Sequence, residues 1–169
     1  MKKHAHCGYC GSAFAADQPW PRLCASCHRV SYLNPTPVAV CLLPVDGGLL
    51  CVRRAIPPAV GQLALPGGYI DLAETWQGAA ARELFEETGL RIDPDEVEHF
   101  RTLSSDRGDG VLLVFGRARP RPVRALDGFT PTAETSELVV VRGAVELAFP
   151  LHTQVVAEFF RERTGPSPG

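Results

Sequence analysis

The stretch from Gly68 to Leu90 limits the folds open to this chain more than any other segment. Its sequence, GYIDLAETWQGAAARELFEETGL, predicts a helix over about residues 75–88. The helix carries Glu83, Glu86 and Glu87 at positions i, i+3 and i+4. At about 3.6 residues per turn, these three carboxylates share one face.

The residues around the carboxylates support the helix without neutralising them. Gly89 is a typical residue just after a helix end, and Ala80, Ala81 and Leu84 can pack on a sheet. Like charges one turn apart destabilise an isolated helix by about 0.2–0.5 kcal/mol per pair, and no Lys on the helix relieves this. Carboxylates without thiol or imidazole suit Mg²⁺ or Mn²⁺. A divalent-metal site is the economical explanation, and a solvated acidic face is the alternative.

Two C-x-x-C pairs occupy the N-terminal part of the chain, the first ending at Cys10 and the second beginning at Cys24. This spacing is close to that of a structural zinc site with four thiolate ligands. A segment this short cannot bury enough apolar surface to fold alone, whereas zinc binding is worth on the order of 10 kcal/mol in zinc-finger peptides. We therefore predict a zinc ribbon, unfolded without metal, whose ligands are Cys7, Cys10, Cys24 and Cys27.

Other roles for the cysteines stay open. A redox or disulfide pair is one alternative. Replacement of one thiolate by a nearby histidine is another, and the candidates are His4, His6 and His28. Cys41 and Cys51 lie inside hydrophobic stretches, where cysteine behaves as a small apolar residue, so we expect both to be buried without a chemical role.

The chain changes character near residues 34–37, where a Cys-, His- and Gly-rich stretch gives way to the apolar run 38–43. Asp46-Gly47-Gly48 is a turn signal, and it predicts that this run pairs with 49–52 as a hairpin. Later elements are expected as strands at 97–103, 111–119 and 138–141, a turn at 106–110 and a closing amphipathic helix at 151–163. Interleaved strands and helices predict an α/β or α+β main domain.

We divide the chain into a zinc ribbon at 1–33, a main domain at 34–164 and a flexible tail at 165–169. Of its 169 residues 45% are hydrophobic, and 17 Lys+Arg stand against 19 Asp+Glu. The net charge of -2 disfavours nucleic acid as a bulk partner, and no apolar run is long enough to predict a membrane partner. Because the N-terminal stretch does not resemble a signal sequence, we expect a cytoplasmic protein.

The fixed positions of the 68–90 segment are similar throughout to the box that defines the Nudix hydrolases. Gly68 is followed after five residues by Glu74, and after seven more by the run Arg82-Glu83-Leu84-Phe85-Glu86-Glu87-Thr88-Gly89-Leu90. The resemblance extends loosely over 37–163, and the ribbon looks like that of a subset of bacterial Nudix enzymes. It implies an α/β/α sandwich around a mixed sheet, preceded by the small zinc ribbon.

The resemblance also implies roles for individual residues. Glu83, Glu86 and Glu87 would be ligands of Mg²⁺ or Mn²⁺ and so part of the catalytic set, assisted by the main-chain carbonyl of Gly67. Arg82 would pair with Glu74 and fix the loop that begins at Gly68, because a bidentate Arg-carboxylate contact is geometrically specific. We treat Gly68, Glu74 and Arg82 as structural parts of the site.

One further group must accept the proton of the attacking water. In the family this base is a box glutamate or a Glu from a later loop, and of the two later candidates, Glu134 and Glu137, we prefer Glu137. Arg53 and Arg54 end a strand near the box and are candidates to bind substrate phosphates, with a solvated strand end as the alternative. Four aromatic residues are candidates for base stacking or, more commonly, core packing: Tyr69, Trp76, Phe115 and Phe149.

The predicted function is a Mg²⁺- or Mn²⁺-dependent hydrolase that cleaves the pyrophosphate bond of a nucleoside diphosphate linked to another moiety, of the ADP-ribose, NADH or FAD type. The secondary signatures for ADP-ribose, NADH and coenzyme A are absent outside the box. A dNTP or NTP pyrophosphohydrolase is therefore an alternative. A non-catalytic nucleotide-sensing regulatory module, whose ribbon binds nucleic acid or protein, is another. The expected partner is a small nucleotide, and a homodimer is left open. For the ribbon itself we expect a supporting role, in which it buttresses the main domain or a dimer interface.

Overall fold

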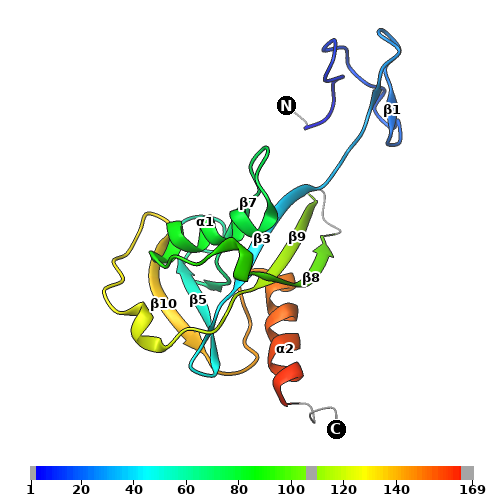
Figure 1. Cartoon of the computed structure of the whole chain (residues 1–169). Helices are drawn as coiled ribbons and strands as arrows, with labels where there is room; N and C mark the ends of the chain where they lie inside the picture. The colour runs from blue at the N-terminus through cyan, green and yellow to red at the C-terminus, as the bar shows by residue number, and fades with distance from the viewer. Residues whose placement is uncertain (1–2, 106–109, 165–169) are drawn as a thin grey trace. The chain divides into compact units, whose positions relative to one another are not determined.

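A computed structural model of the chain describes residues 3–105 and 110–164 (Figure 1). The chain divides into two compact units, Met1–Pro35 and Thr36–Gly169, and each is described by itself below. No helix within the described ranges is both long and apolar enough to cross a membrane. Most of the turn predicted at 106–110, and the tail predicted at 165–169, lie outside the described residues.

The first unit contains a short antiparallel hairpin, β1 (Arg22–Leu23) with β2 (Val30–Ser31), and an isolated bridge between two further residues near its start. Among its described residues, the only buried side chains are Cys7 and Cys24. So little apolar burial cannot offset the conformational entropy lost when a segment of this length becomes ordered. The cysteines themselves therefore form the centre of this unit.

The second unit is built on two four-stranded sheets. One sheet is mixed, in the order β7-β3-β9-β8, because β3 runs parallel to β9 whereas the other neighbours are antiparallel. The second sheet is antiparallel, in the order β10-β5-β4, with β6 also paired to β5. The strands are β3 (Thr36–Leu42), β4 (Pro44–Val45), β5 (Gly48–Arg54), β6 (Leu63–Ala64), β7 (Gly67–Tyr69), β8 (Glu98–Ser104), β9 (Val111–Arg117) and β10 (Thr135–Val141).

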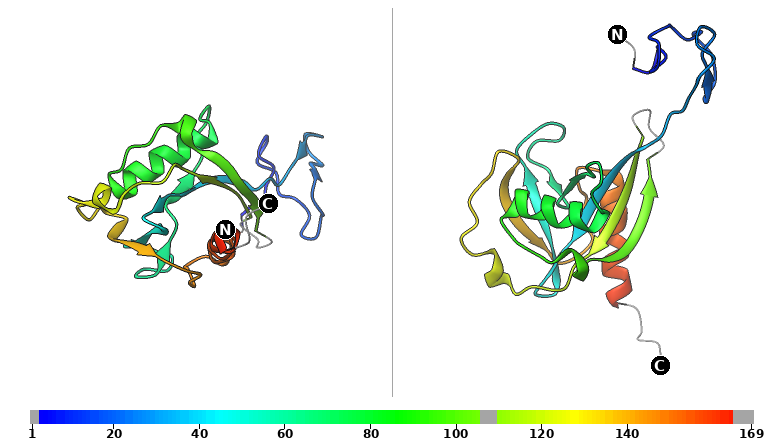
Figure 2. Two further views of the ribbon diagram at one scale, coloured as in Figure 1. Left: turned by 60° about the horizontal axis from the view of Figure 1, so that its bottom comes forward. Right: turned by 45° about the horizontal axis from the view of Figure 1, so that its top comes forward.

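Two helices, α1 (Trp76–Thr88) and α2 (Pro150–Thr164), lie on opposite sides of the sheets, as both views in Figure 2 show. Successive residues of β3 face these two sides: Val40 packs in the core that includes α2, and Ala39 in the core that includes α1. A strand buried on both faces needs no polar alternation, which explains the continuous apolar run at 38–43. The predicted α/β sandwich around a mixed sheet is confirmed.

The predicted hairpin between the runs 38–43 and 49–52 is wrong in its extent. Only the two residues of β4 pair with β5, across a tight turn in which Asp46 and Gly47 both have positive φ, 41° and 81°. The turn signal was therefore correct, since type I′ turns require positive φ at both central residues. The long run before it, β3, instead pairs with β7 and β9 in the other sheet.

The remaining expected elements are present with shifted ends. The strands predicted at 97–103, 111–119 and 138–141 are β8, β9 and β10, and the closing helix is α2. Short 3₁₀ turns, η1 (Pro94–Glu96) and η2 (Val123–Leu126), lie in the connections. Cys41 and Cys51 are fully buried, as expected, and burial raises the pKa of each thiol to about 12.

Candidate functional site

The helix α1 is fixed at both ends, which sets the direction of its three glutamates. The Thr75 side chain accepts a hydrogen bond from the Gly78 N–H at 3.1 Å, as an N-cap does. At the other end Gly89 has φ 77° and donates its N–H to the Phe85 carbonyl at 2.7 Å. The apolar face of the helix, including Leu84, is buried against the sheet, so its carboxylates face the loops.

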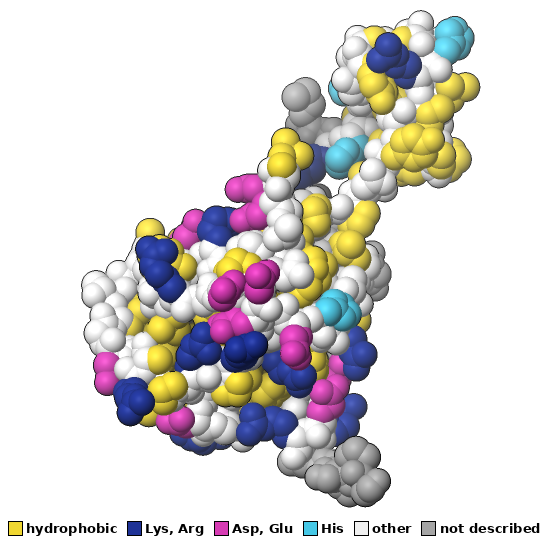
Figure 3. All heavy atoms as spheres, in the orientation of Figure 1, with side chains coloured by type: hydrophobic (Ala, Val, Ile, Leu, Met, Phe, Trp, Pro, Cys, Tyr) yellow, Lys and Arg dark blue, Asp and Glu magenta, His cyan; other side chains and the backbone are white. Residues whose placement is uncertain are grey.

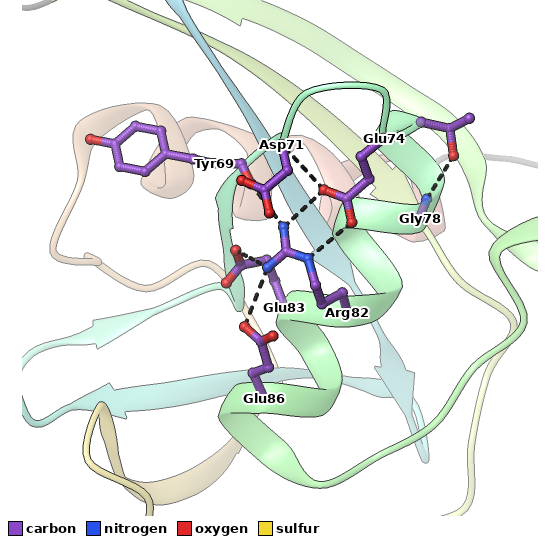
Figure 4. Close-up of polar contacts among 8 residues, drawn as sticks. Tyr69, Asp71, Glu74, Gly78, Arg82, Glu83 and Glu86 are labelled. Atoms are coloured by element: carbon purple, nitrogen blue, oxygen red, sulfur yellow. Dashed lines mark hydrogen bonds and ion pairs between the residues drawn. The ribbon is translucent and has the colours of Figure 1, made fainter.

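Arg82 ties the helix to the loop before it (Figure 4). Its Nε and Nη2 donate to the two carboxylate oxygens of Glu74, each at 2.9 Å, and Nη2 also donates to the Tyr69 carbonyl at 2.9 Å. The hydrogen bonds from Arg82 lower the pKa of Glu74. The contact expected between these two side chains is thus present, in bidentate form.

The same guanidinium reaches two of the candidate metal ligands. Arg82 Nη1 donates to Glu83 Oε1 at 2.7 Å and to Glu86 Oε2 at 3.3 Å. The Glu83 carboxylate also lies directly against Gly68, so that a Cβ at position 68 would collide with Oε1. A side chain at position 68 would therefore displace the Glu83 carboxylate from its present position.

Glu87 is the most deeply placed of the three glutamates, with only 7% of its surface exposed. Its Oε2 accepts a hydrogen bond from the Gly67 N–H at 3.3 Å. Burial raises the pKa of Glu87 to about 8, and the charges of Glu83 and Glu134 add to this shift. Gly67 has no room for a side chain, because a Cβ there would collide with the Ala39 carbonyl oxygen.

These groups open into one pocket of about 600 Å³, which we call the acidic pocket. It collects the three box carboxylates, Asp71 and the loop residue Glu134, so that five acidic groups and two arginines share a cavity large enough for part of a nucleotide. Its lining residues are Arg54, Ile56, Gly67, Gly68, Tyr69, Asp71, Arg82, Glu83, Glu86, Glu87, Thr132, Ala133 and Glu134.

Glu134 reaches the acidic pocket from the loop before β10, and its main chain is pinned on two sides. The Thr132 hydroxyl accepts hydrogen bonds from the N–H groups of Glu134 and Thr135, at 3.2 and 3.0 Å. The Glu134 carbonyl accepts from the Ala55 N–H at 2.7 Å. Sequence reasoning did not single out Thr132, although a threonine two residues before an acidic one is a recognisable turn-forming signal.

Glu137, the preferred later base, is not among the residues that line the acidic pocket. It pairs instead with Arg53, its cross-strand neighbour, with 2.6 Å between Nε and Oε2. Arg53 also donates to the Gly61 carbonyl at 2.9 Å. The structure thus brings Glu134 and Arg54 to the site and joins Glu137 to Arg53 outside it.

Arg54 is held in place by the chain around it. Its Nε donates to the Pro58 carbonyl at 2.8 Å, and its guanidinium lies 5.1 Å from the centre of the Phe149 ring. The Phe149 ring in turn meets the buried His152 edge to face. Such packing fixes the cation at the pocket wall without neutralising its charge.

His152 is a buried residue of the site region that the sequence did not reveal. Its Nδ1 accepts a hydrogen bond from the Leu65 N–H at 3.3 Å, two residues before Gly67. Burial lowers the pKa of His152 to about 3, so the ring is neutral and can accept this bond. A single histidine on the apolar face of the closing helix was the available signal.

Two of the aromatic candidates lie in different environments. Tyr69 is exposed at the pocket, whereas Phe115 is buried in the core.

The candidate metal ligands were tested by their geometry and chemistry. The three box glutamates offer only oxygen donors, which fits Mg²⁺ or Mn²⁺. In the described ranges, however, the only group of three or more His, Cys, Asp or Glu ligand atoms close enough to share one ion is formed by the four predicted cysteines. The glutamates instead make the hydrogen bonds given above, to Arg82 and to the Gly67 N–H.

The four cysteine sulfurs all lie within 4.8 Å of one another. Cys7 and Cys27 have their Sγ atoms 3.7 Å apart, and Cys10 and Cys24 have theirs 3.6 Å apart. A tetrahedral zinc ion with Zn–S bonds of about 2.3 Å requires sulfurs about 3.8 Å apart. The observed arrangement therefore fits a four-thiolate zinc site, with no histidine in the group.

The two cysteine pairs sit on equivalent turns. The Gly11 N–H donates to the Cys7 carbonyl, and the His28 N–H donates to the Cys24 carbonyl, each at 2.9 Å. Gly11 and His28 both have positive φ, 75° and 56°. His28, considered above as a substitute ligand, therefore occupies the position that closes the second turn.

On the face of the second unit seen in Figure 3, acidic and basic side chains are interspersed. No broad basic surface is visible there, in keeping with the net charge of -2. Concentrated negative charge is instead a property of the acidic pocket itself, where carboxylates outnumber arginines.

Comparison with protein families matches residues 34–148 of the chain to the NUDIX domain. Among curated proteins, the NAD-capped RNA hydrolase NudC of Edwardsiella ictaluri is 35% identical over 93 residues, which are 54% of this chain and 36% of that protein. The protein of the same description from Escherichia coli O157:H7 is 28% identical over 105 residues, 62% of this chain and 38% of that protein. The chain thus spans little more than a third of the length of these relatives.

Solved structures share the fold. A NUDIX hydrolase from Nitrosomonas europaea superposes with a TM-score of 0.67 at 24% identity, covering 97% of this chain and 94% of that chain. The NUDIX domain of Shewanella oneidensis NrtR, crystallised with ADP ribose, superposes with a TM-score of 0.63 at 24% identity, covering 79% of this chain and 91% of that chain. At these identities the similarity establishes the fold alone.

Proposed function

The chain belongs to the NUDIX domain family, and from that premise we propose that it is a Mg²⁺- or Mn²⁺-dependent hydrolase of nucleoside diphosphates linked to another moiety. One observation carries the proposal. The acidic pocket brings three box glutamates, a loop glutamate and the tethered Arg54 to a single cavity. A sensor that only binds a nucleotide has no need of that many carboxylates beside a phosphate.

The metal ligands in this proposal are Glu83, Glu86 and Glu87, with the Gly67 carbonyl. When bound, the cation neutralises the negative charge of the pyrophosphate and lowers the pKa of a coordinated water. The chain's own contribution is to present the three carboxylates from one side of the helix α1. Arg82 keeps the helix in register with the loop through its bidentate bond to Glu74.

We assign proton acceptance to Glu134 and phosphate binding to Arg54. Glu134 lines the acidic pocket on a loop segment whose main chain is fixed by hydrogen bonds, so its carboxylate can take the proton of a water attacking a bound phosphate. Arg54 lines the same pocket and offers a positive charge opposite the carboxylates. Glu137 and Arg53 neutralise each other, which argues against either of them acting on the substrate.

The substrate class we propose is a dinucleotide or sugar nucleotide with a pyrophosphate bond, of the ADP-ribose or NADH type. The NudC relatives are described as NAD-capped RNA hydrolases, and the NrtR domain was crystallised with ADP ribose. Both ligands contain an adenosine diphosphate group. This shared chemistry supports the class, while the absence of the NADH signature outside the box argues against a single assigned substrate.

For the first unit we propose a structural zinc site made by Cys7, Cys10, Cys24 and Cys27. Its support is the close approach of the four sulfurs, all within 4.8 Å of one another, and the absence of other buried side chains among the described residues of that unit. In this proposal the zinc ribbon stabilises its own fold and takes no part in the reaction.

The test is a hydrolysis panel with purified protein and Mg²⁺ or Mn²⁺. The substrates are ADP-ribose, NADH, FAD, diadenosine polyphosphates, dNTPs and a short NAD-capped RNA, with products resolved by mass in ¹⁸O-labelled water. We expect monophosphate products only with metal, and near-complete loss with Glu86→Gln or Glu87→Gln. Metal-independent products would reject the metal-dependent mechanism, and no turnover of any substrate together with tight nucleotide binding would favour the sensing module instead.

A further inference from the structure

A second cavity, of about 400 Å³, adjoins the acidic pocket, and we call it the apolar pocket. The two cavities share Glu86 and Thr132 in their walls. The apolar pocket lies between the end of α1 and the segment around η2. Its lining residues are Phe85, Glu86, Thr88, Gly89, Leu90, Ala125, Leu126, Asp127, Gly128, Phe129, Thr130 and Thr132.

The two cavities differ in the ligand chemistry that they offer. The described residues lining the apolar pocket include two phenylalanines and two leucines but neither Lys nor Arg. No lining residue offers a cation to a phosphate, which would also meet the carboxylates of Glu86 and Asp127. The neighbouring Arg91 does not line the pocket and lies over the Phe85 ring. A flat aromatic ring fits better, because rings stack on phenylalanine and because sugar or base donors can bond to the Asp127 carboxylate.

The phenylalanines that would contact such a ring are held by their surroundings. In the segment after η2, the Asp127 N–H donates to the Arg124 carbonyl at 3.2 Å and the Phe129 N–H to the Leu126 carbonyl at 3.3 Å. Gly128 adopts φ 81°, the left-handed conformation that lets the chain reverse before Phe129. On the helix side, the Arg91 guanidinium lies 3.9 Å from the centre of the Phe85 ring.

We infer that the apolar pocket binds the heteroaromatic base of a nucleoside in the substrate, while the pyrophosphate lies in the acidic pocket. The inference rests on the proposed function and adds the specificity-determining residues Phe129 and Asp127. Continuity through Glu86 and Thr132 carries it, because a base and a pyrophosphate are joined by a single ribose and must occupy neighbouring cavities.

Kinetics of the whole chain with ADP-ribose and NADH test the inference. Phe129→Ala should raise KM about tenfold, the factor that corresponds to about 1.4 kcal/mol of lost stacking, and leave kcat within about twofold. Phe129→Tyr should restore KM because it keeps the ring. Val123→Ala is the matched control, since Val123 belongs to η2, is half exposed and does not line the apolar pocket.

A second measurement separates failure of this inference from failure of the proposed function. In EDTA, adenosine should shift the NMR signals of Leu126 and Phe129, whereas ribose 5-phosphate, which lacks a base, should not. Adenosine shifts without any turnover would reject the proposed hydrolase and keep the base site. Turnover by wild type with an unchanged KM in Phe129→Ala, or adenosine shifts confined to other residues, would overturn the base site alone.

Discussion

The two candidate metal sites of this chain are held in opposite ways. In the first unit the four sulfurs already lie within 4.8 Å of one another, and Cys7 and Cys24 are its only buried residues among those described. In the second unit a large apolar core surrounds the sheets, while the box glutamates bond to Arg82 and to the Gly67 N–H. A unit that is folded by its apolar core is stable without metal, so its metal ligands can form hydrogen bonds with other groups. A unit without such a core depends on the metal for folding, so its ligands must remain available to the ion.

This difference separates a metal that folds a chain from a metal that carries out chemistry. The free energy of ordering the first unit has to come from the metal, because little apolar surface is buried there. At the acidic pocket, metal binding instead has to displace hydrogen bonds made by Arg82 and to ionise the buried Glu87. We therefore expect tight, structural binding at the first site and weaker, exchangeable binding at the second.

The strongest test of this contrast is Cys24→Ser. We expect loss of zinc and unfolding of the first unit, because about 10 kcal/mol of metal-binding energy is removed. The second unit should keep its melting temperature and its turnover per folded molecule. Zinc content by mass spectrometry, amide NMR spectra and kcat measure the three effects. Cys51→Ala, in the core of the second unit, is the control that should keep zinc.

A parallel loss of stability in the second unit would contradict this separation. It would mean that the zinc ribbon supports the main domain or a dimer interface, the role expected for it from the sequence. Size-exclusion chromatography with light scattering on both variants would then distinguish an intramolecular support from a dimer contact.

Within the second unit, the expected contrast lies between two glutamates only three residues apart. Glu134→Gln should lower kcat by about 10²-fold or more, because it removes the group assigned to accept the proton. Glu137→Gln should leave kcat within about twofold, since Glu137 pairs with Arg53 outside the acidic pocket. Thermal melting of both variants checks that the fold is retained. The reverse order of effects would return the role of base to Glu137.

The pH should change both the stability of the second unit and the metal affinity of the acidic pocket through the titration of Glu87. Because burial raises its pKa to about 8, Glu87 keeps its proton in the folded metal-free protein and loses it in the unfolded chain above the ordinary value of 4.5. The protonated Glu87 carboxyl therefore stabilises the folded state at low pH, and this stabilisation is lost as the pH rises toward 8. Metal binding requires the ionised form, so Mn²⁺ affinity should rise over the same interval, by at most about tenfold per pH unit.

Calorimetric titration with Mn²⁺, and melting curves in EDTA, both at pH 6, 7 and 8, measure these opposed trends. Glu87→Gln is the control for the melting curves, because it removes the main titrating group and should make their dependence on pH shallower. Glu83, whose pKa burial also raises, acts in the same direction and leaves a smaller residual slope. A melting temperature in EDTA that climbs with pH would contradict the assignment of a protonated, buried Glu87.

The parts of the structure that depend on local sequence were predictable. The helix α1, its final Gly89 and the four-cysteine group follow from spacing within one element or one pair of turns, whereas the Arg82–Glu74 bond was expected from the resemblance to the Nudix box. The strand that pairs with β3 could not be predicted, because the sequence of a strand that is apolar on both faces does not indicate which strand lies beside it. Local pattern thus defines elements, and long-range pairing is left open.

The same limit explains the two late glutamates. Whether Glu134 or Glu137 reaches the box depends on the register of β10 against β5, and that register shifts between Thr135 and Glu137. A one-residue irregularity in a strand changes which side chains share a face. Nothing in the loop sequence itself specifies this irregularity, so the sequence could identify the two candidates but not which of them lines the acidic pocket.

The smallest effect we predict lies in the two cysteine turns. His28 adopts φ 56°, a conformation that is unfavourable for residues other than glycine, whereas the equivalent residue in the first turn is already Gly11. His28→Gly should therefore leave zinc affinity unchanged or raise it, by up to about 1 kcal/mol. Gly11→Ala should lower it by a similar amount, because no atom of the described residues lies within 4 Å of the added Cβ and the backbone strain alone is felt. Competition with a zinc chelator measures both, and a loss of zinc in His28→Gly would mean that the imidazole, not only the turn, takes part in the metal site.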